Sequence, residues 1–373
     1  MRHVLVTRLD SMGDMLAAGP AIRAVAAGAN RVTVLAGPLG AAAARLLPGV
    51  DEVLEWACPW ILSPAPLVEA DSIAGIVEVL RRRAIDEAVV LTSFHQSALP
   101  TALLLRMAGV SRICAVSTDY PGSLLDVRLP EPGDAPESMR MLEVATGAGF
   151  SLPPGDEGRL AVRRPLPSVK LPVNRPFVVA HPGTSAPARA YPEPRWRETV
   201  ALLSNSGWPV VLTGGAGERG LTARIAAGAS DDYHRKNSDG TDHSDRFAAW
   251  QPAPVLDLAG RLDLAELASV LERAAVAVIA NTGPAHLAAA VGTPVVSLFA
   301  PVVPAVRWAP FGVPVALLGD QDAACRGTRC QVCPVPGHPC LNSVRADQVL
   351  AAVRRLAPRV VTTGARSESE ARQ

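Results

Sequence analysis

Residues 3–37 read HVLVTRLDSMGDMLAAGPAIRAVAAGANRVTVLAG, and this stretch decides the fold. Two apolar runs, 3–8 and 31–37, flank the alanine-rich segment 15–29, whose composition favours a helix. Strands that are apolar along their whole length are typical of a parallel sheet covered by helices on both faces. The stretch therefore predicts a β-α-β unit. It places LDSMGD (9–14) at the end of the first strand, at the edge where such sheets bind ligands.

The same alternation of apolar runs and helical patterns continues along the chain and restarts after a proline-rich segment. It predicts an α/β protein with two doubly wound domains, each built on a parallel sheet, that face each other across a cleft. We expect an N-terminal domain over 1–165, a linker over 166–176 and a C-terminal domain over 177–344. The polar, aperiodic segment 229–253 predicts an inserted mobile loop, and the polar tail 363–373 predicts disorder.

The composition of the 373-residue chain restricts its class. It is 49% hydrophobic, 19% charged and 4% aromatic, with a formal net charge of +1. These values indicate a globular protein and give no electrostatic reason to expect a nucleic acid or an anionic membrane as partner. The apolar run before Arg8 is too short for a signal peptide, and prolines and polar residues interrupt the apolar stretch 276–303. We therefore expect a cytoplasmic protein.

Four of the six cysteines fall in CRGTRCQVCPVPGHPC (325–340). In a reducing compartment such residues are thiols or metal ligands. The single C-x-x-C pair is suited to zinc or an iron–sulfur cluster, but the outer spacings match no zinc module. A structural metal and a set of plain thiols both remain open. The candidate ligands are Cys325, Cys330, Cys333 and Cys340.

The segment GAGERG (215–220) follows an apolar run and matches the G-x-G-x-x-G pattern of dinucleotide-binding sites. That pattern also needs an acidic residue about 20 positions later, at the end of the next strand. The acids at 231 and 232 fall in the polar segment 229–253 instead, so the match is weak. What remains is a glycine-rich turn in which Glu218 can accept hydrogen bonds from sugar hydroxyls.

Another loop, ANTGPAHLAAAVGTP (280–294), is suited to phosphate groups. Pro284 favours the first turn of a helix, which would place Thr282 and Gly283 at the N-terminus, where free N–H groups bind anions. The alternative is that Thr282 is only a helix cap and that His286 is packed in the core.

The loop HPGTSAPARAYPEPRW (181–196) also follows a predicted strand. The hydroxyls of Thr184 and Ser185 and the guanidinium of Arg189 would form a clamp for phosphate. The alternative is a solvated loop stiffened by its prolines.

Two loops of the N-terminal half carry polar groups toward the same cleft. In TSFHQS (92–97), His95 and Gln96 either bind the hydroxyls of a ligand or cap the following helix. In LDSMGD, the carboxylates of Asp10 and Asp14 either cap a turn or perform chemistry, and the stretch alone does not decide between them.

Taken in order, these motifs resemble glycosyltransferase family 9, the bacterial heptosyltransferases that build the inner core of lipopolysaccharide. RLDSMGDMLAAGPAIRAV (8–25) is similar to the family's R/K-x-S/D-S-x-G-D…P-A-L/I-R signature. NTGPAHLAAAVGTPVVSLF (281–299) is similar to its D-S/T-G-x-x-H-x-A-A-A-x-G-T-P run. HPGTSAPARAYP (181–192) and CPVPGHPCL (333–341) resemble two further family motifs, so the resemblance covers about residues 1–355.

The resemblance implies a GT-B fold whose N-terminal domain binds the acceptor and whose C-terminal domain binds an ADP-activated sugar, here expected to be a heptose. It implies inversion at the anomeric carbon without a metal or other cofactor, and a final helix, 345–358, that packs back on the N-terminal domain. The family's catalytic base maps to Asp14. Its donor-binding residues map to Thr184, Ser185, Arg189, Glu218, Leu262, Asn281, Thr282, Gly283 and His286. Toward the acceptor we expect Asp10, Ser11, Gly13, His95 and Gln96.

On this interpretation Gly13 permits a tight approach at the cleft, and Asp10 stabilises the turn or caps the helix. The chain departs from the family pattern at Arg189, which replaces a lysine, and at Asn281, which replaces an aspartate and is not an anion. These departures leave the donor sugar open.

Three functions remain as hypotheses. The first is a monomeric transferase whose partners are an ADP-sugar and a glycan or small-molecule acceptor. It would touch a membrane, at most peripherally, through a lipid-linked acceptor. The second is a GT-B-type epimerase or phosphorylase acting on a nucleotide sugar. The third, suggested by Asn281, is a catalytically inactive nucleotide-sugar-binding protein.

Overall fold

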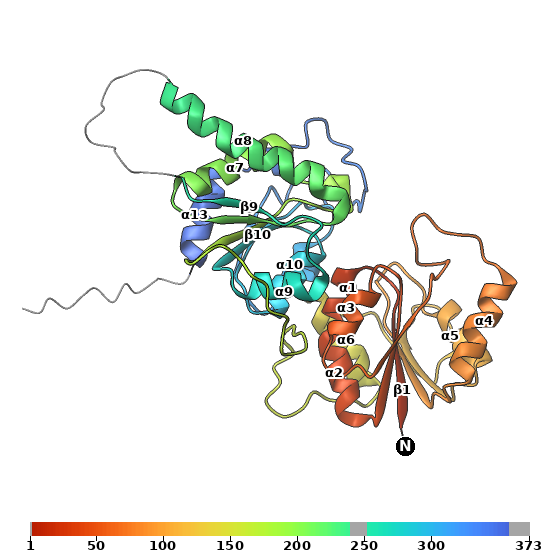
Figure 1. The fold of residues 1–373 in the computed structure, drawn as a ribbon. Coiled ribbons are helices and arrows are strands. Elements are labelled where there is room, and N and C mark those ends of the chain that lie inside the picture. The colour runs from red at the N-terminus through yellow and green to blue at the C-terminus, as the bar shows by residue number, and fades with distance from the viewer. Residues whose placement is uncertain (1, 239–251, 358–373) are drawn as a thin grey trace, which may run out of the picture.

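The stretch 3–37 folds as a β-α-β unit, in which β1 (His3–Arg8) pairs in parallel with β2 (Arg31–Ala36). The structure is a computed structural model that describes residues 2–238 and 252–357. It has two α/β lobes, each built on a six-stranded parallel sheet (Figure 1). The prediction of two doubly wound domains is therefore confirmed.

In the N-terminal lobe the strand order is β3-β2-β1-β4-β5-β6, so the order reverses between β1 and β4. The loops after these two strands therefore border the crevice in which such sheets bind ligands. The further strands are β3 (Glu52–Glu55), β4 (Glu87–Val90), β5 (Arg112–Val116) and β6 (Val127–Leu129). The helices are α1 (Met12–Ala17), α2 (Gly19–Gly28), α3 (Ala41–Leu46), α4 (Ala70–Arg81), α5 (Leu99–Met107) and α6 (Glu137–Gly147).

In the C-terminal lobe the order is β12-β11-β10-β7-β8-β9, which reverses between β7 and β10. The strands are β7 (Val178–His181), β8 (Val210–Leu212), β9 (Val255–Asp257), β10 (Val276–Ala280), β11 (Val295–Leu298) and β12 (Val315–Leu318). The α-helices are α7 (Glu193–Asn205), α8 (Arg219–Ser238), α9 (Leu264–Glu272), α10 (Gly283–Ala290), α11 (Ala305–Trp308), α12 (Pro339–Asn342) and α13 (Ala346–Leu356). Short 3-10 turns are Gly122–Leu124, Pro187–Arg189 and Ala216–Glu218.

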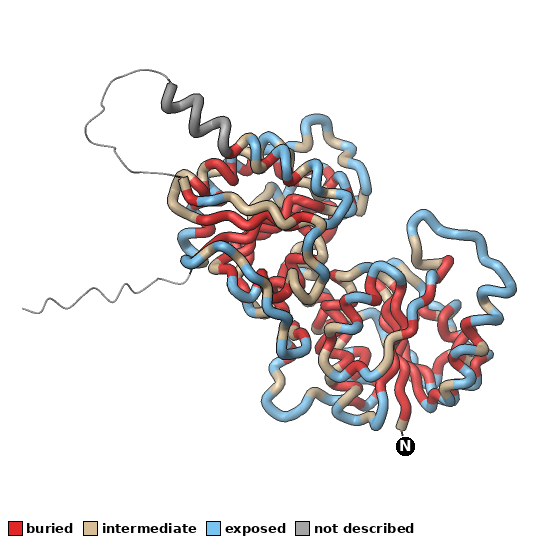
Figure 2. The backbone as a smooth tube through the Cα atoms, in the orientation of Figure 1, coloured by how far each residue is buried: buried red, intermediate tan, exposed pale blue. Residues whose placement is uncertain are grey.

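The two lobes share one apolar core where they meet. Helix α1 packs against α10, and α3 packs against α9 (Figure 1). The buried cluster that contains Leu16 of α1 and Ala44 of α3 also contains Leu271 of α9 and Leu287 of α10. Figure 2 shows the buried residues concentrated in the strands and in the inner faces of the helices of each lobe. The loops after β1 and β10 lead directly into α1 and α10. The packing of these two helices against each other therefore sets the distance across the cleft.

Two predictions about the second half are corrected. The final helix, predicted to pack on the N-terminal domain, packs as α13 against α7 and the strands β10, β11 and β12 of its own lobe. The reason is its apolar stripe, in which Val349 and Val353 are fully buried against that sheet. The first part of the predicted loop 229–253 is helical, because α8 continues to Ser238. The rest of that loop, 239–251, and the predicted tail 363–373 lie outside the described residues.

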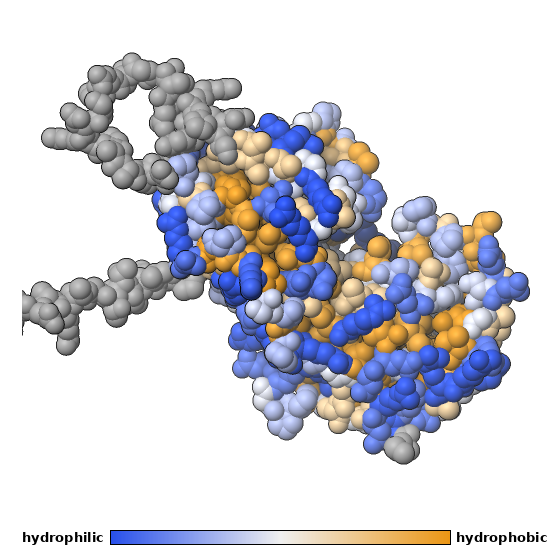
Figure 3. All heavy atoms as spheres, in the orientation of Figure 1, coloured by the Kyte–Doolittle hydropathy of each residue, from blue (hydrophilic) through white to orange (hydrophobic). Residues whose placement is uncertain are grey.

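The surface shows no division into a charged and an apolar half on the face in view. Figure 3 shows hydrophilic and apolar side chains interspersed over both lobes.

Within the described ranges, no helix combines the length and the apolar character that crossing a membrane requires.

The contact between the ends of β1 and β2 yields a stability prediction. A Cβ atom added to Gly37 would overlap the carbonyl oxygen of Leu9, which is backbone and cannot rotate away. We expect Gly37→Ala to lower the free energy of unfolding by about 1–3 kcal/mol, measured by urea denaturation. Gly75→Ala is the matched control, because Gly75 lies in α4 with open space around it and alanine favours a helix. Equal stability of the two variants would contradict the prediction.

Candidate active site

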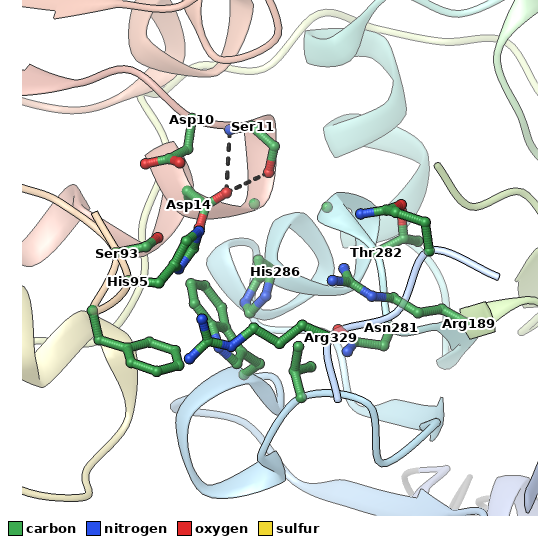
Figure 4. Close-up of a pocket in the computed structure, with 16 residues that line it drawn as sticks. Asp10, Ser11, Asp14, Ser93, His95, Arg189, Asn281, Thr282, His286 and Arg329 are labelled. Carbon is green, nitrogen blue, oxygen red and sulfur yellow. Dashed lines mark hydrogen bonds between the residues drawn. The ribbon is translucent and has the colours of Figure 1, made fainter. Parts of the chain in front are cut away.

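A cavity of about 240 Å³ lies between the lobes, at the carboxyl ends of the strands where each sheet reverses its order. The N-terminal lobe contributes the loops after β1 and β4, and the C-terminal lobe contributes the loops after β7 and β10 and two later segments (Figure 4). The cavity is lined by Asp10, Ser11, Gly13, Asp14, Ser93, Phe94, His95, Arg189, Asn281, Thr282, Gly283, His286, Val303, Trp308, Arg329 and Gln331.

A buried arginine organises the acidic wall of this cavity. Arg8, the last residue of β1, has a side chain with no exposed surface. Its Nη2 lies 2.9 Å from Asp14 Oδ1 and donates a hydrogen bond of 2.8 Å to Ser93 Oγ, while its Nε lies 3.1 Å from Asp10 Oδ2. Glu137, the first residue of α6, is 3.9 Å from Nη1. One guanidinium therefore joins three carboxylates and one hydroxyl from three segments.

The two aspartates differ in how their charge is stabilised. Burial would raise the pKa of Asp14, but the charge of Arg8 and the hydrogen bonds from Ser11 outweigh burial and hold that pKa below its usual value. For Asp10, burial outweighs the attraction of Arg8, and the nearby charge of Asp14 adds to burial, so its pKa is raised. Burial also raises the pKa of Glu137. Asp14 is thus the carboxylate whose ionised form the site favours.

The role predicted for Asp10 in the turn is wrong. Ser11 is the N-cap residue of α1, and Asp14 Oδ2 accepts hydrogen bonds from the Ser11 N–H at 3.1 Å and the Ser11 hydroxyl at 2.6 Å. Asp10 instead accepts a hydrogen bond of 2.5 Å from Gln96 Nε2. The reason is spacing, because a carboxylate three residues after the N-cap can reach back to the free N–H groups of the first turn. Gln96 therefore positions Asp10 and does not line the cavity.

The glycine predicted to permit a tight approach does so. A Cβ atom on Gly13 would lie 3.1 Å from His286 Cδ2 and 3.3 Å from the Cα of Gly283, both in α10 of the other lobe. His286 lines the cavity, and burial lowers its pKa to about 4 although Asp14 opposes the shift, so the ring is neutral at pH 7. It is both buried and part of the cavity wall, so the two alternatives for this histidine do not exclude each other.

The opposite wall is suited to an anion. Thr282 is the N-cap of α10 and Pro284 lies in its first turn, so the N-terminal end of this helix lines the cavity at Thr282 and Gly283. Arg189 lies beside them, and burial lowers its pKa, which Asp14 opposes. Its Nε is buried without a hydrogen-bond partner among the residues that the structure describes. Unpaired N–H groups of this kind attract phosphate oxygens.

Four predicted donor-binding residues lie outside the cavity. The Thr184 hydroxyl hydrogen-bonds within its own loop to Ala186, and Ser185 is exposed. The Glu218 carboxylate accepts a hydrogen bond of 2.6 Å from Gly215 N–H and packs against Gly183, so it holds two loops together. Leu262 packs against the shared core.

Several lining residues were not among the predicted ones. Ser93 and Phe94 adjoin His95, so the position of TSFHQS after a strand was a usable signal for them. Val303, Trp308, Arg329 and Gln331 come from segments after β11 and β12. These segments carry no binding pattern in the sequence, and only the fold brings them to the cavity.

The cysteine segment does not form a metal site in the structure. Across residues 2–238 and 252–357, no group of three or more His, Cys, Asp or Glu side chains is placed to hold a metal ion. Cys325 and Cys340 are buried, and burial raises the pKa of Cys340 to about 12, so this thiol is protonated. The described part of the chain therefore identifies no metal site at Cys325, Cys330, Cys333 and Cys340.

Comparison with known proteins identifies the family. The model of glycosyltransferase family 9 (heptosyltransferase) matches residues 79–335. The chain belongs to this family. A Pseudomonas aeruginosa relative, lipopolysaccharide heptosyltransferase 1, is 32% identical over 190 residues, which cover 50% of this chain and 46% of the relative. The chain thus spans about half the length of the curated relatives it matches.

Solved structures of heptosyltransferases share the two-lobed fold. The Escherichia coli ADP-heptose lipopolysaccharide heptosyltransferase II is 19% identical, with a TM-score of 0.67 over 95% of this chain and 98% of that one. An Escherichia coli heptosyltransferase with ADP-2-deoxy-2-fluoro heptose is 20% identical, with a TM-score of 0.64 over 95% and 100%. The expected GT-B fold of family 9 is therefore confirmed.

The buried ion pairs of this family 9 site yield a prediction. Arg8→Met leaves Asp10, Asp14 and Glu137 buried without their cation, so we expect a loss of about 3–5 kcal/mol of unfolding free energy at pH 7. The loss should shrink toward pH 4.5. Removing the cation raises the carboxyl pKa values further, so these groups take up protons as the pH falls and their repulsion disappears. Urea denaturation at both pH values measures the two losses.

The matched control for that experiment is Arg45→Met. Arg45 pairs with Glu55 at 3.5 Å with both side chains about half exposed, so this variant should change stability by less than about 1 kcal/mol. An Arg8→Met protein as stable at pH 7 as Arg45→Met would show that Arg8 does not hold the site together.

Proposed function

We propose that this protein is an inverting glycosyltransferase that moves a heptose from ADP-heptose to a hydroxyl group of a glycan or natural-product acceptor. The observation that carries the proposal is the placement of an ionised carboxylate, Asp14, across one cavity from Arg189 and the N-terminus of α10. A base on one wall and anion-binding groups on the other are what attack by a hydroxyl and departure of a diphosphate require.

The reaction proposed is a single displacement. The acceptor oxygen forms a bond to the anomeric carbon as the bond from that carbon to the β-phosphate oxygen breaks, and ADP leaves with the electron pair. The proton of the acceptor hydroxyl passes to Asp14, which Arg8 and Ser11 keep ionised beforehand. Arg189 and the free N–H groups of α10 stabilise the charge that develops on the diphosphate.

Asn281 supports a role for the same wall in holding the sugar. Its side chain lines the cavity and is 6% exposed, and its Nδ2 has no hydrogen-bond partner within the described ranges. A buried amide N–H without a partner costs stability, so a ligand oxygen that accepts its hydrogen bond would be favoured. An aspartate there would accept hydrogen bonds from sugar hydroxyls, whereas Asn281 can also donate one.

The base assignment is tested with Asp14→Asn. We expect kcat to fall by a factor of about 10²–10⁴, measured as ADP release from ADP-heptose with a lipopolysaccharide inner-core fragment as acceptor, because the amide cannot take the proton. The Kd for ADP should stay within about twofold. Asp347→Asn is the matched control, because Asp347 lies exposed on α13 and pairs only with Arg345 among the described residues. Wild-type turnover by Asp14→Asn would contradict the proposed base.

The donor is tested by thermal shift with ADP, UDP, GDP and dTDP. A ligand that binds only the folded protein stabilises it by about 2.7 kcal/mol at one hundred times its Kd, so the preferred nucleotide gives the largest rise in Tm at equal concentration. We expect that nucleotide to be ADP. Rapid conversion of the nucleotide sugar without any acceptor would instead support an epimerase or phosphorylase.

Catalysis without a metal is part of the proposal, because Arg189 and the α10 N-terminus supply positive charge at the leaving group. Dialysis against EDTA should leave the rate unchanged, and a loss of activity that zinc or iron restores would contradict this part.

We also propose the cytoplasm as the location. All six cysteines, which lie in described segments, are free thiols, as in a reducing compartment.

A further inference from the structure

Helices α4 and α5 carry exposed apolar side chains on their outer face. On α5, Leu103 and Met107 are 50% and 52% exposed and lie one turn apart, whereas Thr101 and Leu105 on the opposite side are buried. Val79 of α4 is 38% exposed. Figure 1 shows the two helices next to each other on the side of the N-terminal lobe that points away from the C-terminal lobe. Val79, Leu103 and Met107 define what we call the α4–α5 face.

Exposed apolar side chains are concentrated around this face. Among the described residues, nine large hydrophobic side chains are exposed, and six of them belong to α4, α5 or the segments next to these helices. The six residues are Leu67, Val68, Val79, Leu103, Met107 and Tyr120. Tyr120 adjoins α5 because the 3-10 turn that follows it packs against that helix. Apolar side chains scattered singly over a surface are ordinary, but a group of them marks a surface for binding.

The fold of the lobe does not require these side chains. The inner faces of α4 and α5 already bury Ile76, Leu80 and Leu105 in one apolar cluster with the strand residues Leu5 and Val90. Apolar side chains that stay in water contribute no burial energy to the fold. Covering them with another surface would remove their apolar area from water and would therefore be favourable.

The charges of α4 are separated along the helix. Glu69 precedes α4 and Asp71 lies in its first turn, and neither carboxylate has an ion-pair partner among the described residues. At the other end, Arg81 and Arg82 share one carboxylate, Glu78, at 2.9 Å and 2.8 Å. The α4–α5 face therefore has an acidic end and a basic end. This separation also suits the dipole of α4 itself, but the dipole gives no reason for the apolar side chains beside it.

A second copy of this chain is complementary to such a face. Because α4 and α5 each connect two parallel strands, they run in the same direction. A twofold axis that crosses both helices would place each helix antiparallel to its own copy. Leu103 and Met107 would then lie against the α5 helix of the second copy. The acidic end of each α4 would face the basic end of the other.

A lipid surface is not complementary to the same face. The three carboxylates and two arginines of α4 and its flanking residue leave no net positive charge there. Two further arginines nearby are paired, Arg83 with Glu52 and Arg106 with Asp126. An anionic bilayer attracts clusters of unpaired basic residues, and the α4–α5 face has none among the residues described.

We propose that the α4–α5 face binds the same face of a second copy, so that the protein is a symmetric dimer with antiparallel helices at its interface. This inference replaces the expectation of a monomer and does not depend on the reaction proposed above. The loop after β4, which lines the cavity at Ser93, Phe94 and His95, leads into α5. Pairing of α5 would therefore restrain a loop of the cavity from the side opposite the C-terminal lobe.

Sedimentation equilibrium over about a hundredfold range of protein concentration tests the proposal. We expect the mass to rise from that of one chain, 38.9 kDa, toward twice that value. Leu103→Glu should raise the Kd of the dimer about tenfold or more, because it removes apolar contact and buries like charges. Leu39→Glu is the matched control, since Leu39 is 68% exposed and precedes α3, which packs on the other face of the sheet. The control should dimerise like the wild type.

Charge reversal tests the antiparallel arrangement. Asp71→Arg and Arg82→Glu should each weaken the dimer, because each places like charges opposite one another. Both reversals in one chain should restore the wild-type Kd to within about threefold, because every end of α4 again meets the opposite charge. Arg45→Glu, on α3, is the matched control and should leave the Kd unchanged. The Tm of every variant separates loss of the dimer from loss of the fold.

Three results would overturn the proposal. They are a wild type that stays at the mass of one chain throughout, a Leu103→Glu protein that dimerises as tightly as the wild type, and a double reversal as weak as the single ones. Vesicles of phosphatidylethanolamine and phosphatidylglycerol provide a fourth test. Co-sedimentation of a monomeric wild type, abolished by Leu103→Glu, would assign the face to a lipid surface instead. A dimer that releases no ADP would contradict only the proposed function.

Discussion

The site depends on one buried cation. Arg8 has no exposed surface, and such a charge is stable inside a protein only when carboxylates and hydrogen bonds replace the water it has lost. Its partners come from the loop after β1, the loop after β4 and the start of α6. These three segments are far apart in the sequence, so the guanidinium fixes their positions relative to one another and with them the acidic wall of the cavity.

The same cation gives the two aspartates different properties. Asp14 pairs with Arg8 and accepts two hydrogen bonds from Ser11, and these interactions lower its pKa. Asp10 is held by Arg8 and Gln96, but burial dominates and its pKa rises. Two neighbouring carboxylates that share one guanidinium are thereby separated into one that stays ionised and one that takes up a proton more readily. This separation is the physical ground for preferring Asp14 as the base.

The cavity also depends on how closely the lobes approach. Gly13 and Gly283 face each other where α1 meets α10, and a side chain on either would push against the other lobe. The shared apolar core beneath them, with Leu16 and Leu287, holds this contact together. The acidic wall and the anion-binding wall therefore face each other across the cavity, as the proposed proton acceptor and the proposed leaving-group site require.

The sequence alone predicted the features that follow from local pattern. Apolar runs alternating with helical segments predicted two parallel sheets, and loops after the reversing strands predicted Asp14, Arg189, Thr282 and His286 in one cleft. The acid assigned to the α1 cap was the wrong one, although the three-residue spacing from Ser11 to Asp14 was a usable local signal. The sequence also placed Thr184, Ser185, Glu218 and Leu262 in the donor site, although in the structure they lie outside the cavity.

Tertiary structure decided the rest. Arg329, Trp308 and Gln331 reach the cavity only because segments after β11 and β12 fold back over the carboxyl end of the sheet, and no local pattern encodes such contacts. The final helix likewise packs on its own lobe because Val349 and Val353 find an apolar surface there. The sequence by itself determined the strands, the helices and the loops that follow them, because these depend on nearby residues. The partners of Arg8, the place of Arg329 in the cavity and the meeting of the two glycines were decided by packing between distant segments.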